Sequence, residues 1–166
     1  MILAIDIHYK STYVKNVGVL FNWPDQEPRQ TIVNQLAEVA EYVPGEFYKR
    51  ELPCILAIIA EVNLDEIDAI VVDGHVYIDN DYQHGLGGYL YEALDQKLPI
   101  IGVAKRAFHK NEQTNIPVLR GKSANPLYVS AIGMDVETAA AQIKSMHGEY
   151  RLPTILQILD TETKTD

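Results

Sequence analysis

The alternation of apolar and polar residues divides the chain into strand-like and helix-like stretches. Short apolar or alternating runs predict strands over 2–9, 13–21 and 29–33, and the stretch that follows, 34–41, fits either helix or strand. Continuous apolar runs, which suit strands covered on both faces, occupy 68–72, 99–103 and 127–132. Helical spacing of apolar residues marks 46–62, 87–96, 135–146 and 154–159.

The order of these elements predicts one domain over residues 1–166, built on a mixed sheet. Three antiparallel strands come first, because short polar links join them. Beyond residue 46 strands and helices alternate, which favours parallel strands joined by crossovers. Pro53 lies inside the first helical stretch, so we expect a kink there or a helix start near it. Asp135 is placed to cap the helix over 135–146. The fold class is therefore α/β, with helices flanking the sheet.

Composition and charge limit the kinds of partner that the protein could bind. The net charge of -9 argues against sequence-independent binding to nucleic acid. However, six of the 14 Lys and Arg residues lie between Lys97 and Lys122, with one of the 23 Asp and Glu residues. This segment fits either a basic face or an ordinary solvated loop. The single cysteine, Cys54, excludes an internal disulfide and suits a reducing cytoplasm. No apolar run approaches the roughly 20 residues of a membrane span, so no membrane partner is expected.

Three carboxylates from separate segments are candidates for a metal site. Asp73 follows the apolar run 68–72, and in open α/β sheets ligands gather at the carboxyl ends of the strands. Asp6 lies within the first strand, and Glu51 lies in the first helical stretch. Together they would suit a hard divalent cation such as Mg²⁺, which can activate water and offset charge on a phosphodiester. Each alone also fits a solvated or capping carboxylate. The sequence has no Gly-Lys-Ser/Thr phosphate loop and no Gly-x-Ser-x-Gly elbow.

Several short motifs follow one another in an order that resembles the endonuclease V family. They are AIDIHY, YVPGEFYKRELP, VVDGH, GLGGYL, LPIIGVAK, NPLYVSAIGMDVETA and YRLP, and they cover nearly the whole chain. The combination is specific, whereas any one motif alone would be weak. The resemblance implies an RNase H-like fold and cleavage of DNA or RNA near deoxyinosine or inosine, in DNA repair. It also implies Mg²⁺ as cofactor, with Mn²⁺ as the alternative.

The resemblance further implies roles for individual residues. The metal-binding carboxylates would be Asp6, Glu51, Asp73 and Asp160. The catalytic set would comprise Asp6, Glu51, Asp73 and Lys105, with the lysine balancing phosphate charge. The segment of Tyr42, Val43, Pro44 and Gly45 matches a wedge that enters the duplex beside the lesion, where an aromatic ring can stack on bases. Further contacts with nucleic acid are expected from His75, Lys105 and Arg106.

Two differences from the family pattern keep other functions open. Asp79 stands where the family commonly has a second histidine, and Ile132-Gly133-Met134 lacks the histidine that often follows this glycine. The leading hypothesis is a metal-dependent endonuclease that acts near deaminated adenine. The alternatives are a nucleic-acid-binding module of the same fold with little cleavage, and a small-molecule phosphohydrolase. The preference for DNA or RNA and the oligomeric state stay open.

Overall fold

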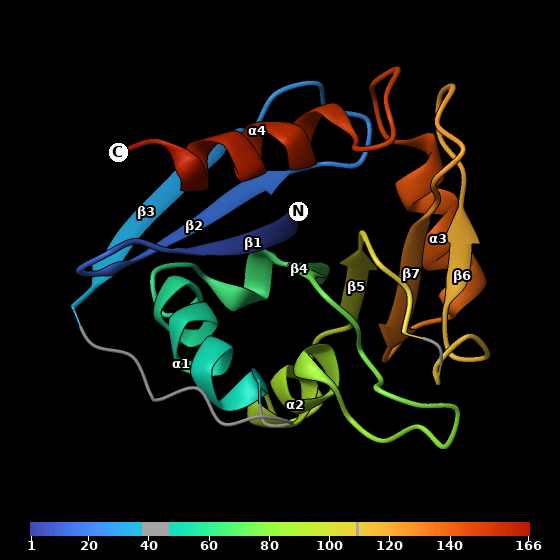
Figure 1. Ribbon diagram of the computed structural model, residues 1–166. Coiled ribbons are helices and arrows are strands. Elements are labelled where there is room, and N and C mark those ends of the chain that lie inside the picture. The colour runs from blue at the N-terminus through green and yellow to red at the C-terminus, as the bar shows by residue number, and fades with distance from the viewer. Residues whose placement is uncertain (38–46, 109) are drawn as a thin grey trace.

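A seven-stranded sheet with helices on both faces forms the centre of the structure, a computed structural model that describes residues 1–37, 47–108 and 110–166 (Figure 1). The strands are β1 (Ile2–Tyr9), β2 (Val14–Phe21), β3 (Gln30–Leu36), β4 (Ala69–Asp73), β5 (Ile100–Ala104), β6 (Ile116–Val118) and β7 (Leu127–Ile132). The helices are α1 (Phe47–Ile59), α2 (Leu86–Ala93), α3 (Val136–Ser145) and α4 (Thr154–Lys164), with the 3-10 turn η1 (Leu64–Glu66).

The sheet mixes antiparallel and parallel pairs. Its strand order is β3-β2-β1-β4-β5-β7-β6. The first three strands form an antiparallel meander, in which Ile2 lies opposite Phe21. β4 then pairs parallel with β1, and β5 pairs parallel with β4. β7 and β6 complete the sheet as antiparallel neighbours. This arrangement confirms the predicted fold class, a mixed α/β sheet of the RNase H-like type.

Each face of the sheet carries its own apolar core. α3 and α4 cover one face, where Ala4 and Val71 belong to the buried cluster, and α1 and α2 cover the other, where Leu3, Ile5 and Ile70 do (Figure 1). Side chains of a strand alternate between the two faces, so neighbouring residues of β1 and β4 fall into different cores. The continuous apolar runs noted in the sequence are strands of this kind, covered from both sides.

β2 is buried along its whole length, including two polar residues. Asn16 Nδ2 donates a hydrogen bond to Asn34 Oδ1 at 2.8 Å. Lys15 Nζ donates to the carbonyl oxygens of Glu162 at 2.6 Å and Thr165 at 3.0 Å, at the C-terminal end of α4. A helix ends with unpaired carbonyl groups and partial negative charge, which a cation can satisfy. The lysine therefore fixes the end of α4 against the sheet.

Several predicted boundaries shift in the structure. Within the described residues, β3 continues to Leu36, so the first part of the ambiguous stretch is strand. α1 contains Pro53 in its interior and begins six residues before it. α2 ends at Ala93, because Asp95 and Gln96 adopt positive φ angles of 56° and 59°. The side chain of Asp135 caps α3 as expected and accepts a hydrogen bond from the backbone N–H of Thr138.

Two features of the sheet differ from the prediction. The run at 127–132 is a strand, but it pairs antiparallel with β5 and not parallel to it. β6 was not predicted, because a three-residue strand that contains Pro117 has no clear alternation. Cys54 of α1 is fully buried. None of the described helices is long and apolar enough to cross a membrane.

Candidate active site

Three neighbouring strands place a charged residue on the face of the sheet that α4 covers: Asp6 within β1, Asp73 at the end of β4 and Lys105 directly after β5. Ile5 of β1 lies beside Val72 of β4 in the last pair of the β1–β4 ladder, so the residues that follow, Asp6 and Asp73, come together where the two strands separate. Because side chains alternate along a strand, both acids belong to the face that α4 covers. Lys105 follows β5 directly and falls on the same face. This is the edge of the sheet where ligands gather in open α/β folds.

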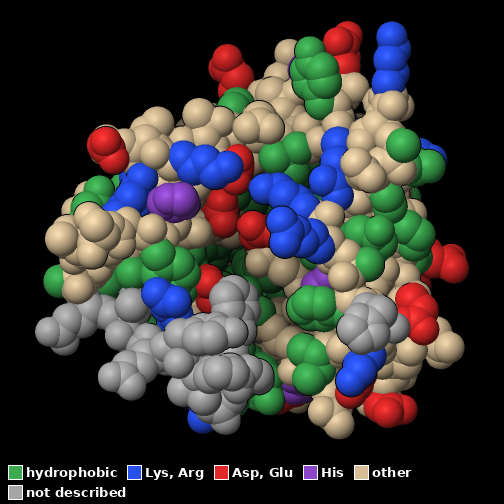
Figure 2. Space-filling view, in the orientation of Figure 1, with side chains coloured by type: hydrophobic (Ala, Val, Ile, Leu, Met, Phe, Trp, Pro, Cys, Tyr) green, Lys and Arg blue, Asp and Glu red, His purple; other side chains and the backbone are tan. Residues whose placement is uncertain are grey.

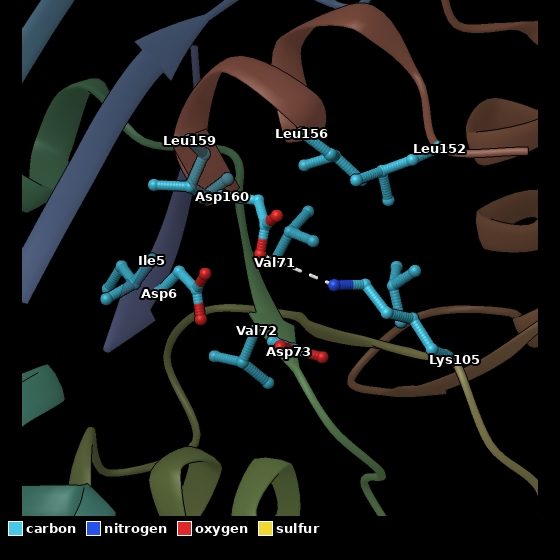
Figure 3. A pocket seen from close by; sticks show the side chains of 12 residues that line it. Ile5, Asp6, Val71, Val72, Asp73, Lys105, Leu152, Leu156, Leu159 and Asp160 are labelled. Carbon is cyan, nitrogen blue, oxygen red and sulfur yellow. Dashed lines mark hydrogen bonds and ion pairs between the residues drawn. The ribbon is translucent and has the colours of Figure 1, made fainter. Parts of the chain in front are cut away.

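One cavity lies between α4 and the part of the sheet that carries Asp6, Asp73 and Lys105 (Figure 3). Asp160 of α4 points into it, with one carboxylate oxygen 3.4 Å from Lys105 Nζ and the other 2.9 Å from Lys164 Nζ. Thr163, on the same helix, places its hydroxyl 3.4 Å from Asp6 Oδ2. The apolar part of the lining consists of Ala4, Ile5, Val71, Val72, Val103, Leu152, Leu156 and Leu159.

Asp6 and Asp73 are held in surroundings that disfavour their negative charge. Burial, reinforced by the charge of Asp73, raises the pKa of Asp6 from 3.8 to about 6. The pKa of Asp73 is raised as well, mainly by burial, although part of this side chain reaches solvent and Lys105 acts in the opposite sense. Apolar walls weaken the screening between like charges. A cation placed between the two acids would offset the cost of burying their charges and reduce the repulsion between them.

Asp160 differs from these acids. Burial alone would raise its pKa, but the hydrogen bond from Lys164 and the positive charges of Lys105 and Lys164 lower it below 3.8. It therefore carries a full negative charge at neutral pH. Figure 2 shows acidic side chains in a hollow with Lys and Arg side chains gathered beside it, so the acidic centre has a basic border.

Glu51 approaches the same region from the other face of the sheet. It lies on α1, and its side chain is 8% exposed. The hydroxyl of Tyr9, at the end of β1, donates a hydrogen bond to Glu51 Oε1 at 3.0 Å. Burial is the main cause that raises the pKa of Glu51 from 4.5 to about 7, and the charges of Asp6 and Asp73 add to it, while the bond from Tyr9 opposes it. Burial, followed by the charge of Glu51, also raises the pKa of Tyr9, which keeps the hydroxyl a donor.

The chemistry of this donor set fits a hard divalent cation. All the acids concerned offer carboxylate oxygens, which Mg²⁺ prefers, and the raised pKa values of Asp6 and Glu51 show that positive charge would be favourable there. Among the side chains that the structure describes, no three His, Cys, Asp or Glu groups stand close enough to hold a metal as they are placed. Convergence of Asp6, Glu51 and Asp73 on one cation stays a prediction, and it requires the carboxylates to draw together.

His75 follows Asp73 by two residues and is 7% exposed. Its Nδ1 accepts a hydrogen bond from Asn111 Nδ2 at 3.2 Å, so Nε2 carries the proton and donates to the carbonyl oxygen of Arg106 at 2.9 Å. The ring also packs against Phe108, with 4.6 Å between the ring centroids. In this arrangement His75 holds the segment after Lys105 in place. A direct contact between His75 and nucleic acid stays a prediction.

The backbone after Asp73 crosses close over β5. A Cβ atom on Gly102 would lie 2.5 Å from the carbonyl oxygen of Gly74 and 2.7 Å from Ser130 Oγ, so a larger residue than glycine does not fit there. Gly74 itself adopts a φ of 146°, which favours glycine. Ser130 Oγ accepts a hydrogen bond from the backbone N–H of Val76 at 2.9 Å. These contacts set the direction in which the chain leaves Asp73.

The structure thus brings together most, but not all, of the residues singled out in the sequence. Asp6, Asp73, Lys105 and Asp160 line one cavity, and Glu51 lies beside it. Arg106 is exposed next to the cavity. The wedge segment 42–45 lies outside the described residues. Sequence reasoning missed Tyr9, although the signal was present: it is three residues after Asp6, so strand alternation turns it toward the opposite face and toward Glu51.

Solved structures of known proteins resemble this fold over nearly its whole length. The catalytic domain of human Endonuclease V matches with a TM-score of 0.77 and 20% sequence identity, covering 98% of this chain and 80% of that one. Endonuclease V of Ciona intestinalis, in complex with a 24mer DNA that contains an inosine followed by a ribo-adenosine, matches with a TM-score of 0.78 and 16% identity, covering 98% and 83%. At such identities the likeness establishes the fold.

The sequence itself matches the family model of Endonuclease V over residues 1–118. Among curated proteins, Endonuclease V of Pyrococcus horikoshii is 27% identical over 165 residues, which cover 98% of this chain and 72% of that protein. Endonuclease V of Pyrococcus abyssi is also 27% identical over 165 residues, covering 98% and 78%. The matched region contains β1, α1, β4 and β5, the elements that supply Asp6, Glu51, Asp73 and Lys105 to the site. The chain therefore belongs to the endonuclease V family.

Proposed function

We propose that this protein hydrolyses a phosphodiester bond near a deaminated adenine, inosine or deoxyinosine, in nucleic acid. The observation that carries the proposal is the meeting of Asp6 and Asp73 on the neighbouring strands β1 and β4, in one cavity with Asp160 and Lys105. Membership of the family supports the reaction class. The inosine in the DNA bound by the Ciona intestinalis relative supports the type of substrate.

Mg²⁺, or Mn²⁺ in its place, would be held by Asp6, Asp73 and Asp160, with Glu51 completing the set from the side of α1. Such a cation supplies positive charge to the phosphate and activates water for attack. The carboxylates of this chain bind and place it, and their repulsion for one another falls when it is present. The leucines of the cavity wall keep water away from one side, which strengthens the electrostatic interactions within.

Lys105 would place its ammonium group against the phosphate. Its side chain is 41% exposed and is paired with Asp160 at 3.4 Å, so it can exchange this partner for a phosphate oxygen. Arg151 stabilises the backbone at this point, because its guanidinium donates to the carbonyl oxygens of Lys105 and Pro126. Lys105 and the exposed Arg106 lie side by side in the sequence at the cavity, and would attract the nucleic-acid backbone.

The test compares Asp73→Asn with Asp68→Asn. Asp68 lies directly before β4, at the opposite end of the same strand, and its side chain is 81% exposed. Both changes remove one negative charge and nearly conserve volume. With Mg²⁺ and an inosine-containing duplex, we expect wild type and Asp68→Asn to cleave, and Asp73→Asn to bind the duplex without cleaving it. An adenosine duplex of the same sequence serves as the substrate control.

Lys105→Met gives a second, independent arm. We expect it to lose most of the cleavage rate, whereas Lys122→Met, which removes an exposed lysine from the same basic segment, should keep it. Cleavage by Asp73→Asn at the wild-type rate would refute the mechanism. A wild type that binds inosine-containing strands but cleaves none of them, with either metal, would make the protein a binding module. Cleavage limited to small phosphate esters would point to a phosphohydrolase.

A further inference from the structure

The end of β1 provides one group to each face of the sheet. Asp6 belongs to the face covered by α4, where Thr163 contacts it. Ile7 and Tyr9 belong by alternation to the face covered by α1, and Ile7 packs against the apolar core of that face. Tyr9 is the last residue of β1, so its ring extends beyond the strand toward the helix that carries Glu51.

Glu51 would reach the metal site from a different direction than the other acids. Asp6, Asp73 and Asp160 line the cavity beneath α4, whereas Glu51 stands on α1 across the sheet edge. A glutamate side chain has three rotatable bonds, and burial among apolar neighbours alone does not select one position for its carboxylate. The hydroxyl of Tyr9, 3.0 Å from Glu51 Oε1, does select one.

We infer that Tyr9 is a positioning residue, which fixes the Glu51 carboxylate so that its second oxygen is offered to the cation. This inference rests on the proposed function. The phenol has one proton to donate, and it is directed at one of the two carboxylate oxygens, so Oε2 keeps its lone pairs for a metal. Hydrogen bonds to metal ligands from neighbouring residues commonly change metal affinity by about tenfold to a hundredfold.

Arg50 keeps the tyrosine ring in place. Its guanidinium carbon lies 3.8 Å from the centroid of the Tyr9 ring, in a cation–π arrangement. Arg50 directly precedes Glu51 in α1. The same turn of the helix therefore packs Arg50 on the Tyr9 ring and accepts the hydrogen bond of the Tyr9 hydroxyl through Glu51. The orientation of the hydroxyl is thereby tied to the helix that it serves.

The substitution Tyr9→Phe removes the hydroxyl and leaves the ring for Arg50 to pack on. Tyr13→Phe is the matched control, because it also removes one phenol hydroxyl. Tyr13 lies close by in the sequence, at the end of the turn in which its carbonyl oxygen accepts from the N–H of Lys10. Mn²⁺ affinity is measured by titration calorimetry on the full chain, and cleavage is measured as a function of Mn²⁺ concentration. We expect Tyr9→Phe to weaken Mn²⁺ binding about tenfold or more. Its cleavage should recover at high Mn²⁺, with KM for the oligonucleotide unchanged, and Tyr13→Phe should behave as wild type.

A coupling measurement separates positioning from a general loss of structure. In the background of Glu51→Gln the ligand charge is already gone, so adding Tyr9→Phe should leave Mn²⁺ affinity within about twofold of the single variant. Equal Mn²⁺ affinity for wild type and Tyr9→Phe, or an equally large loss in both backgrounds, would overturn the inference. A wild type that does not bind Mn²⁺ would overturn it too. A wild type that binds Mn²⁺ but cleaves no inosine strand would remove the proposed function, while the affinities still decide the role of Tyr9.

Discussion

Glu51 should destabilise the metal-free protein at neutral and alkaline pH. Folding raises its pKa from 4.5 to about 7, chiefly by burial. A carboxyl group whose pKa is raised by folding contributes fully to the free energy of unfolding below pH 4.5, where it is protonated in both the folded and the unfolded state. This contribution is lost as the pH rises through 7. Each unit of pKa difference corresponds to about 1.4 kcal/mol, so the folded state loses about 3 kcal/mol by pH 8. Solvent screens this penalty little, because Glu51 is 8% exposed.

Glu51→Gln removes this penalty and keeps an oxygen that can accept the hydrogen bond from Tyr9. In EDTA at pH 8 we expect the variant to be more stable to urea by about 3 kcal/mol, which moves the midpoint by roughly 1 to 2 M. At pH 4.5 the two proteins should unfold at similar urea concentrations. Glu27→Gln, a change of an exposed glutamate, should alter neither result.

Metal should reduce this difference in stability. Saturating Mg²⁺ stabilises whichever protein binds it more tightly in the folded state, and wild type has the extra carboxylate. The stability gap at pH 8 should therefore narrow when Mg²⁺ is added. If Glu51→Gln is no more stable than wild type at pH 8 in EDTA, then Glu51 is not held in the charge-disfavouring setting described above, and the argument for a cation there fails.

Three further outcomes are expected. Ser130→Ala should lower the free energy of unfolding by about 1 to 3 kcal/mol in urea titrations, because the buried N–H of Val76 loses its acceptor. Lys15→Met should cost a similar amount, since its ammonium satisfies carbonyl groups at the end of α4, while the exposed Lys122→Met should change stability by less than about 0.5 kcal/mol. Binding of the inosine duplex should weaken steeply between about 50 and 200 mM salt if the basic border contacts phosphates.

The sequence predicted the sheet edge of the site well, because its signals are local. The apolar run that ends at Asp73 marks a strand buried on both faces, and the charge after it marks the carboxyl end. The direction of β7 was wrong for a physical reason. Parallel neighbours need a crossover of a dozen or more residues, usually helical, whereas the segment between β5 and β7 forms the short strand β6 and no described helix. The apolar residues from 105 to 126 lack helical spacing, and this could have indicated that β5 and β7 pair antiparallel.

The end of α4 is the part that local signals could not predict. Apolar spacing stops at Leu159, where the sequence predicted the helix to end, yet the structure continues it to Lys164. The added residues include threonines, which favour helix weakly. Two interactions stabilise the last turns of α4. Lys15, distant in the sequence, donates to a carbonyl oxygen at the end of the helix, and Lys164 forms an ion pair with Asp160 four residues earlier.

This extension matters for function, because it places Asp160 in the cavity wall and Thr163 against Asp6. A helix that ended at Leu159 would not fix Asp160 through its i,i+4 pair with Lys164, nor place Thr163 against Asp6. The position of Asp160 therefore depends on Lys15, which lies in β2 and whose ammonium group donates hydrogen bonds to Glu162 and Thr165 at the end of α4. Substitutions at Lys15 should accordingly weaken metal binding through α4, in addition to their effect on stability.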